Sequence, residues 1–239
     1  VVAIVVVKQF FGGIGQNFVN PALVGRIVLM ASFPTMMSTW VQPFAWRGVQ
    51  VVTTASPLAS ISSMFTAGDV SAAATASNPA LPSLWQMLIG QRQGSLGEVC
   101  ALALLLGFAY LLIRRVITPV IPLTYIGTVA VIMLIAGKGS LSFVAYEILG
   151  GGLLLGAIFM ATDYTTSPIN FKGKLIYGVG CGILTALIRL FGSLPEGVSF
   201  SIIIMNILVP HIERLTTPKP FGSAKTPKKK QSRKKEAGA

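Results

Sequence analysis

Residues 141–168 read LSFVAYEILGGGLLLGAIFMATDYTTSP, and this pattern indicates the fold class. Residues 141–161 form an apolar run with a single charged side chain, Glu147, and the run ends in hydroxyl and carboxyl groups followed by Pro168. About 20 apolar residues are enough to cross a bilayer as a helix. Because backbone amides inside a bilayer must be paired within the protein, such a run predicts a membrane helix.

Similar runs recur along the chain. They cover residues 20–33, 95–113, 120–136, 175–191 and 198–212. Glycines inside these runs, as at residues 150–152 and 178–182, let helices approach one another closely. The sequence therefore predicts an all-α, polytopic membrane bundle, with five complete helices after a broken first helix.

Composition agrees with this class. The chain of 239 residues is 53% apolar and 11% charged, with a mean hydropathy of +0.73, whereas soluble domains carry about 25% charged residues. The net charge of +12 is concentrated near the C-terminus, since eight of the nineteen Lys and Arg residues follow residue 215. We therefore expect the basic tail to contact anionic lipid, and we expect no nucleic-acid partner.

Four segments organise the chain. Residues 1–33 are expected to hold the end of a span whose beginning is missing, a Gly- and Asn-rich break, and a helix. Residues 34–94, rich in Ser, Thr, Ala and Pro, form a long segment of the kind that is functional or disordered. Residues 95–215 are the five-helix bundle, and residues 216–239 are the basic tail.

The positions of the cations predict the orientation, because cytoplasmic loops carry the excess of Lys and Arg. If every run crosses once, three groups of cations fall on one side: Arg114 with Arg115, Lys172 with Lys174, and Arg214 with the tail. We therefore expect a cytoplasmic C-terminus and an extracytoplasmic segment 34–94.

The first break, residues 11–22, reads FGGIGQNFVNPA. Irregular backbone at membrane depth is tolerated where it lines a cavity or is buried in protein. The break is either a tight turn into a helix capped by Asn20, or a broken helix whose polar groups face a ligand or an ion. The candidate residues are Gly12, Gly13, Gly15, Asn17 and Asn20.

The second break, residues 159–168, contains Asp163 and Thr165 before Pro168. Asp163 either caps the helix end or pairs with Lys172 or Lys174, or it belongs to a cofactor site or ion path. Both breaks follow an apolar helix and end in a proline. That likeness predicts two related halves with a site between discontinuous helices.

Other polar groups are weaker candidates. Arg26, Glu98, Glu147 and Arg189 lie in or beside apolar runs, and each is either paired, extended toward the interface, or part of an ion path. Two hydroxyl-rich strings, residues 52–59 and 69–75, have no adjacent His or Lys to act as a base. We predict no catalytic triad and no metal site.

These strings together resemble the D subunits of Rnf electron transport complexes and, more distantly, the B subunits of sodium-pumping NADH:quinone oxidoreductases. The resemblance covers nearly all of residues 1–222. It rests on the two breaks, on IRLFG at residues 188–192, on PEGV at residues 195–198 and on residues 216–221.

The resemblance implies a redox subunit of the bacterial inner membrane. It implies electron transfer of the ferredoxin–NAD type coupled to Na⁺ or H⁺ transport, with the other Rnf subunits as partners. It also implies FMN attached by a phosphoester to a hydroxyl in an Ala-Thr-Pro-Leu context, and it allows a second, non-covalent flavin.

The matching context here is ASPL at residues 55–58, in which Ser replaces Thr. We predict that Ser56 carries FMN within a turn shaped by Thr53, Thr54 and Pro57, with Thr75 as the alternative attachment site. Two other functions remain open: a secondary transporter that binds a solute at the broken helices without a redox cofactor, and a scaffold for partner subunits.

Overall fold

The computed structural model describes residues 1–13, 15–41, 53–54, 56–66, 81–95, 97–192 and 196–218. Its architecture is helical, as predicted. The described chain also contains two strands of two residues each, β1 (Trp40–Val41) and β2 (Thr53–Thr54), which pair antiparallel. The predicted tail beyond residue 218 and Thr75 lie outside the described residues.

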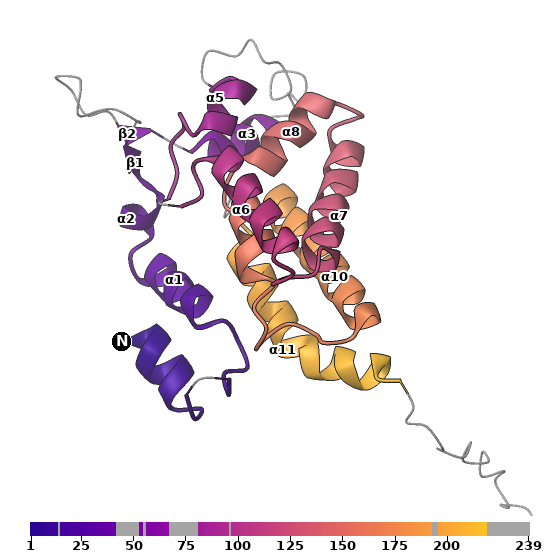
Figure 1. Cartoon of the computed structure of the whole chain (residues 1–239). Coiled ribbons are helices and arrows are strands. Elements are labelled where there is room, and N and C mark those ends of the chain that lie inside the picture. The colour runs from indigo at the N-terminus through magenta and orange to yellow at the C-terminus, as the bar shows by residue number, and fades with distance from the viewer. Residues whose placement is uncertain are drawn as a thin grey trace, which may run out of the picture.

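Three helices form the centre of the bundle: α7 (Val120–Ala136), α10 (Phe171–Phe191) and α11 (Val198–Thr216). The most extensive helix packing is between α10 and α7 (Figure 1). Glycines on α10 allow this approach, because a Cβ at Gly182 would lie 2.6 Å from the Thr128 Cβ, and a Cβ at Gly178 would overlap Thr124. Small residues at this interface are what membrane helix pairs use.

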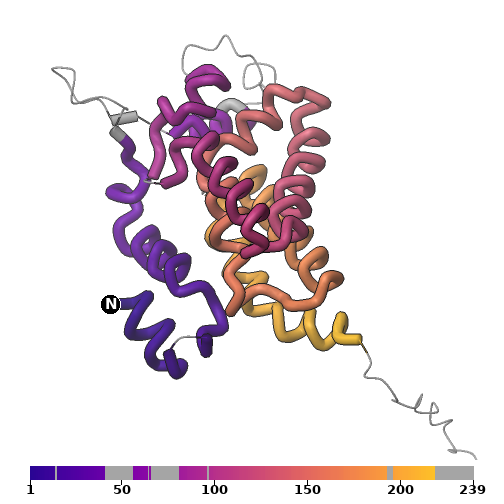
Figure 2. The backbone as a smooth tube through the Cα atoms, viewed as in Figure 1, coloured from indigo at the N-terminus to yellow at the C-terminus, as the bar shows by residue number. Residues whose placement is uncertain are grey.

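The remaining helices surround this centre. α1 (Pro21–Ser32) packs beside a π-helical segment, Val2–Gln9, at the edge of the bundle (Figure 2). α2 (Pro34–Ser38) follows α1. α3 (Pro57–Thr66) and α5 (Leu84–Ile89) lie near α8 (Leu141–Leu149) at the end of the bundle opposite to the C-terminal end of α11 (Figure 1). α6 (Ala101–Ile113) packs against α5.

The apolar run at residues 141–161 is not the single helix that we predicted. The run divides into α8, the short α9 (Leu153–Leu155) and a π-helical segment, Gly156–Met160. The axis of α8 meets the axis of the following helical part, Leu153–Met160, at 65°. The cause is the glycine triplet, because Gly150 is extended and Gly151 has a φ of 59°. The left-handed region is strained for residues that carry a side chain.

By length and composition, two of the described helices, α10 and α11, are each sufficient to cross a membrane, and the bent pair adds a third span if it is counted as one. α1, α6 and α7 are shorter apolar helices. Large apolar side chains such as Leu106, Ile135 and Phe191 are exposed on the outside. Polar side chains such as Thr185, Ser201 and Asn206 are buried inside, which is the distribution expected of a bundle in lipid.

The candidate functional site

The two sequence breaks lie against each other. The Asn17 side-chain amide donates to the Thr165 hydroxyl at 3.3 Å and to the Val19 carbonyl at 3.2 Å. The Asn20 amide approaches the Met160 carbonyl at 3.5 Å. The structure therefore joins Asn17, Asn20, Asp163 and Thr165, which are four of the predicted site residues, in one place.

Asp163 organises the second break. Its Oδ2 accepts hydrogen bonds from the Thr165 hydroxyl at 3.0 Å and the Thr166 hydroxyl at 3.2 Å. Of the alternatives for Asp163, pairing with a lysine is not seen among the described residues, since Lys174 donates to Thr118 instead. Because neutral donors do not cancel the charge of a carboxylate, the local field suits a cation or a proton.

The glycines of the first break have a different role. Gly12, Gly13 and Gly15 all have positive φ values, between 86° and 107°, a backbone conformation open mainly to glycine. They turn the chain from the first helical segment toward α1. Asn20 then caps α1 by accepting from the Ala22 and Leu23 amides at 3.0 and 3.4 Å. The predicted turn into a capped helix is therefore confirmed, and its Asn side chains also reach the second break.

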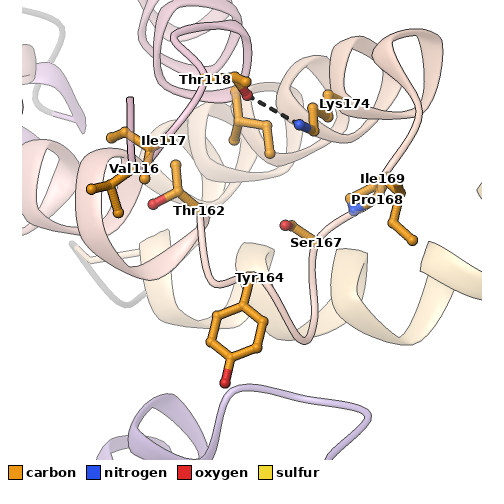
Figure 3. A pocket seen from close by; sticks show the side chains of 10 residues that line it. Val116, Ile117, Thr118, Thr162, Tyr164, Ser167, Pro168, Ile169 and Lys174 are labelled. Carbon is orange, nitrogen blue, oxygen red and sulfur yellow. Dashed lines mark hydrogen bonds between the residues drawn. The ribbon is translucent and has the colours of Figure 1, made fainter. Parts of the chain in front are cut away.

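A cavity of about 210 Å³ opens beside the second break. Its wall combines residues from the connection between α6 and α7 with residues of the second break, and Lys174 reaches across it to Thr118 at 3.1 Å (Figure 3). The lining is Val116, Ile117, Thr118, Ile121, Thr162, Tyr164, Ser167, Pro168, Ile169 and Lys174. Two of the cation groups predicted to be cytoplasmic therefore lie at the same end of the bundle.

A second cluster lies around the glycine triplet between α8 and α9, and we call it the charge cluster. It contains three arginines and three glutamates: Arg26, Arg92, Arg189, Glu98, Glu147 and Glu196. Four of the six were named from the sequence as paired or ion-path residues. All are now seen to be paired or bonded to the backbone, which is how buried charges are usually stabilised.

Two groupings make up the charge cluster. On one side, Arg189 pairs with Glu147 at 3.0 Å and donates to the carbonyls of Glu147 and Gly150. On the other side, Arg26 contacts Glu196 closely and lies 3.8 Å from Glu98. The Arg26 guanidinium therefore interacts with two carboxylates, those of Glu98 and Glu196.

The glycine triplet joins the two groupings. Glu196 accepts from the Gly152 amide at 2.8 Å, and Arg92 donates to the Gly151 carbonyl at 3.4 Å. A Cβ at Gly152 would lie 3.0 Å from both the Glu98 and the Glu196 carboxylate. Burial and the neighbouring Glu98 carboxylate raise the pKa of Glu196. The backbone at the bend is thus bonded to three charged side chains, those of Arg92, Arg189 and Glu196.

The predicted flavin-attachment residues lie at the start of α3. The Ser56 hydroxyl accepts from the Ala59 amide at 3.2 Å and so caps α3, with Pro57 as the first helical residue. Thr53 and Thr54 form β2 just before it. Leu58 packs on the glycine triplet, since a Cβ at Gly150 would lie 3.5 Å from its side chain. The first turn of α3 therefore lies against the glycine triplet.

Sequence reasoning missed several buried polar groups. The hydroxyls of Tyr125, Thr185 and Ser201 form a triangle, and Tyr177 contacts Asn206 at 2.6 Å. A signal was available, because Tyr177, Cys181, Thr185 and Arg189 recur every four residues within an apolar run. Such spacing places polar side chains on one face of a helix.

The sequence matches the NQR2, RnfD, RnfE family over residues 1–222. It is 44% identical, over 95% of its length, to the D subunit of the Na(+)-translocating ferredoxin:NAD(+) oxidoreductase complex of Acetobacterium woodii. It is 40% identical, over 93% of its length, to the D subunit of the proton-translocating ferredoxin:NAD(+) oxidoreductase complex of Clostridium ljungdahlii.

A third relative, the D subunit of the ion-translocating oxidoreductase complex of Stutzerimonas stutzeri, is 37% identical over 92% of the chain. The chain spans 66% of the length of each of the first two relatives and 68% of the third. The resemblance expected from the two breaks is confirmed at the level of the family. With a match that extends from the first residue through α11, the chain belongs to the NQR2, RnfD, RnfE family.

Proposed function

We propose that this chain acts as the D subunit of a bacterial inner-membrane complex that couples electron transfer between ferredoxin and NAD to Na⁺ or H⁺ translocation. The observation that carries the proposal is the 44% identity over 95% of the chain to a relative that bears this name. The other subunits of such a complex would be its partners. The meeting of the two breaks supports the proposal, because discontinuous helices commonly form ion and substrate sites.

We further propose that FMN is attached to Ser56 through a phosphoester. The fit rests on the position of the Ser56 hydroxyl, which is half-buried at the N-terminus of α3. A phosphate there would replace the cap and meet free amides and the positive end of the helix dipole. Bound FMN would supply one-electron and two-electron redox chemistry, while Thr53, Thr54 and Pro57 would shape the attachment turn.

The two breaks together supply the candidate membrane-embedded site. Asn17, Asn20, Asp163 and Thr165 present amide and carboxyl groups from two chain segments to one place. This pairing of donors and acceptors would suit a translocated ion or a second, non-covalent flavin. We propose an extracytoplasmic position for residues 34–94 and a cytoplasmic C-terminus.

In-gel fluorescence tests the flavin. The full-length protein, expressed with its flavin transferase and denatured, should give a fluorescent band that Ser56→Ala abolishes. Ser63→Ala is the matched control, because Ser63 is exposed on the same helix and donates only to the Ser60 carbonyl among the described contacts. Loss of the band in Thr75→Ala alone would move the attachment to Thr75.

A complete lack of covalent flavin would favour the transporter or scaffold function instead. In that case solute uptake by the reconstituted full-length protein, measured without electron donors, separates the transporter from the scaffold. The orientation is tested with a reporter fused after Ala239, which should be active on the cytoplasmic side.

A further inference from the structure

The buried face of α10 carries a polar column. Tyr177, Cys181, Thr185 and Arg189 follow one another at intervals of one helical turn, and none is more than 5% exposed. At 1.5 Å per residue, the column extends about 18 Å along the axis of α10. That is more than half of the roughly 30 Å of hydrocarbon in a bilayer.

Three hydroxyls occupy the middle of the column. Tyr125 of α7 lies 2.6 Å from Thr185 of α10 and 2.9 Å from Ser201 of α11, and Thr185 lies 2.7 Å from Ser201. Since a hydroxyl both donates and accepts, the three protons can be arranged in more than one way without moving an oxygen. Such a group can receive a proton on one side and release another proton on the opposite side.

The lower end of the column reaches the two breaks. In the orientation that satisfies both polar atoms of the Asn206 side chain, its nitrogen lies 2.6 Å from the Tyr177 hydroxyl, and its oxygen accepts from the backbone amide of Asn20 at 3.2 Å. The Asn20 side-chain amide in turn approaches the Met160 carbonyl at 3.5 Å. The column therefore begins at the first break, where it meets the second break.

The upper end of the column reaches the charge cluster. Arg189 is the last column residue on α10, and it is paired with Glu147 at 3.0 Å beneath the glycine triplet. The charge cluster at this end contains the Glu147 carboxylate, and the two breaks at the other end contain the Asp163 carboxylate. The side chains of the column between them are hydroxyl and thiol groups.

The packing of the helices does not by itself require the hydroxyls of the column. Thr124 and Thr128 on α7 show the ordinary arrangement, in which a hydroxyl donates to the carbonyl one turn earlier on its own helix, at 2.7 Å in both cases. Tyr125, Thr185 and Ser201 bond across three helices, and the Ser201 hydroxyl also lies 2.9 Å from the Val198 carbonyl of its own helix. Polar groups inside a membrane bundle are costly and commonly mark ion or proton paths.

We propose that the polar column carries protons between the two breaks, which contain Asp163, and the charge cluster. This proposal rests on the proposed function of this chain in an ion-translocating complex. In each step one O–H or S–H bond breaks and another forms, so a proton that enters at one carboxylate is balanced by a proton that leaves at the other. Protons fit better than Na⁺, because hydroxyls 2.6–2.9 Å apart leave no room for an ion between them.

The test uses the intact complex, containing the full-length chain, in proteoliposomes with a pH-sensitive dye. The readout is the number of protons moved per electron transferred. Thr185→Val removes the hydroxyl but keeps the shape, and it should lower this ratio by about a hundredfold, the low end of what a positioned proton-transfer group contributes. Thr185→Ser keeps the hydroxyl and should retain proton movement, as should the matched control Thr128→Val.

Comparing the two Thr185 variants separates proton conduction from packing. If Thr185 had only a structural role, the variant with the isosteric Val would work better than the variant with the smaller Ser. If Thr185→Val does not assemble, Tyr125→Phe tests the same triangle and should also lower the ratio. Unchanged proton movement in the assembled variants, or a wild-type complex that moves Na⁺ without protons, would overturn the proposal. Failure of the proposed function would give a different result, because the wild-type protein would then show neither covalent flavin nor electron transfer.

Discussion

The side-chain amide of Asn17 donates to the hydroxyl of Thr165 although the two residues are 148 positions apart. The same hydroxyl donates to Asp163 at 3.0 Å. Asn17 therefore acts on the Asp163 carboxylate through one intermediate hydroxyl, and the first break and the second break form a single unit.

Asn17→Asp should disrupt this unit. The substitution replaces an amide donor by a second carboxylate near Asp163, so it removes a hydrogen bond and adds repulsion. We expect a loss of about 1–3 kcal/mol in stability, measured by thermal unfolding of the purified protein in detergent. Thr165→Ser is the control, because it keeps the hydroxyl. A stable Asn17→Asp protein would show that the contact contributes little.

Gly178→Ala should weaken the packing of α7 on α10. The added methyl group would overlap Thr124, and helix displacement of this kind costs about 1–3 kcal/mol. Gly127→Ala on α7 is the matched control, since its Cβ would meet nothing within 4 Å and alanine favours a helix by about 1 kcal/mol. Unfolding midpoints of the two variants should therefore move in opposite directions, and equal midpoints would contradict this account of the interface.

Arg189→Met should be among the most damaging single substitutions. It leaves the Glu147 carboxylate buried without its partner, which costs about 3–5 kcal/mol. The double variant Arg189→Met with Glu147→Met removes both charges, so we expect it to recover much of the loss. Unfolding in detergent measures both effects, and a double variant no more stable than the single variant would contradict the pairing.

The stability of the protein should depend on pH through Glu196. Its pKa is raised in the folded protein, so between the ordinary glutamate value of about 4.3 and the raised value the folded state binds more protons than the unfolded state. This contribution to stability should therefore fall as the pH rises through that window. Glu196→Gln should make the stability depend less on pH in this window. If the unfolding midpoint of the variant changes with pH as steeply as that of the wild type, the assigned contribution of Glu196 is wrong.

Sequence reasoning located the helices well because each apolar run carries its own signal. The run at residues 120–136 has the same bounds as α7, and Asn20 with Pro21 marked the start of α1. The bend at residues 150–152 was missed, since glycines that permit close packing and glycines that permit a left-handed turn look alike in sequence.

The candidate site was predictable only in part. The two breaks were identified separately, and nothing local to Asn17 indicates that it would meet Thr165. Glu196 was noted only within the PEGV string and not as a charged candidate, yet it binds both Arg26 and the Gly152 amide. Contacts between distant segments arise from the packing of whole helices, so they require the fold.

The charge cluster also constrains the order in which the chain can be assembled. Arg26 emerges from the ribosome 170 residues before Glu196, and an unpaired arginine is costly in lipid. Glu98 can meet Arg26 earlier, but the closer contact of Arg26 is with Glu196. We therefore expect α1 to reach its final place in the membrane only after the segment that carries Glu196 has been made.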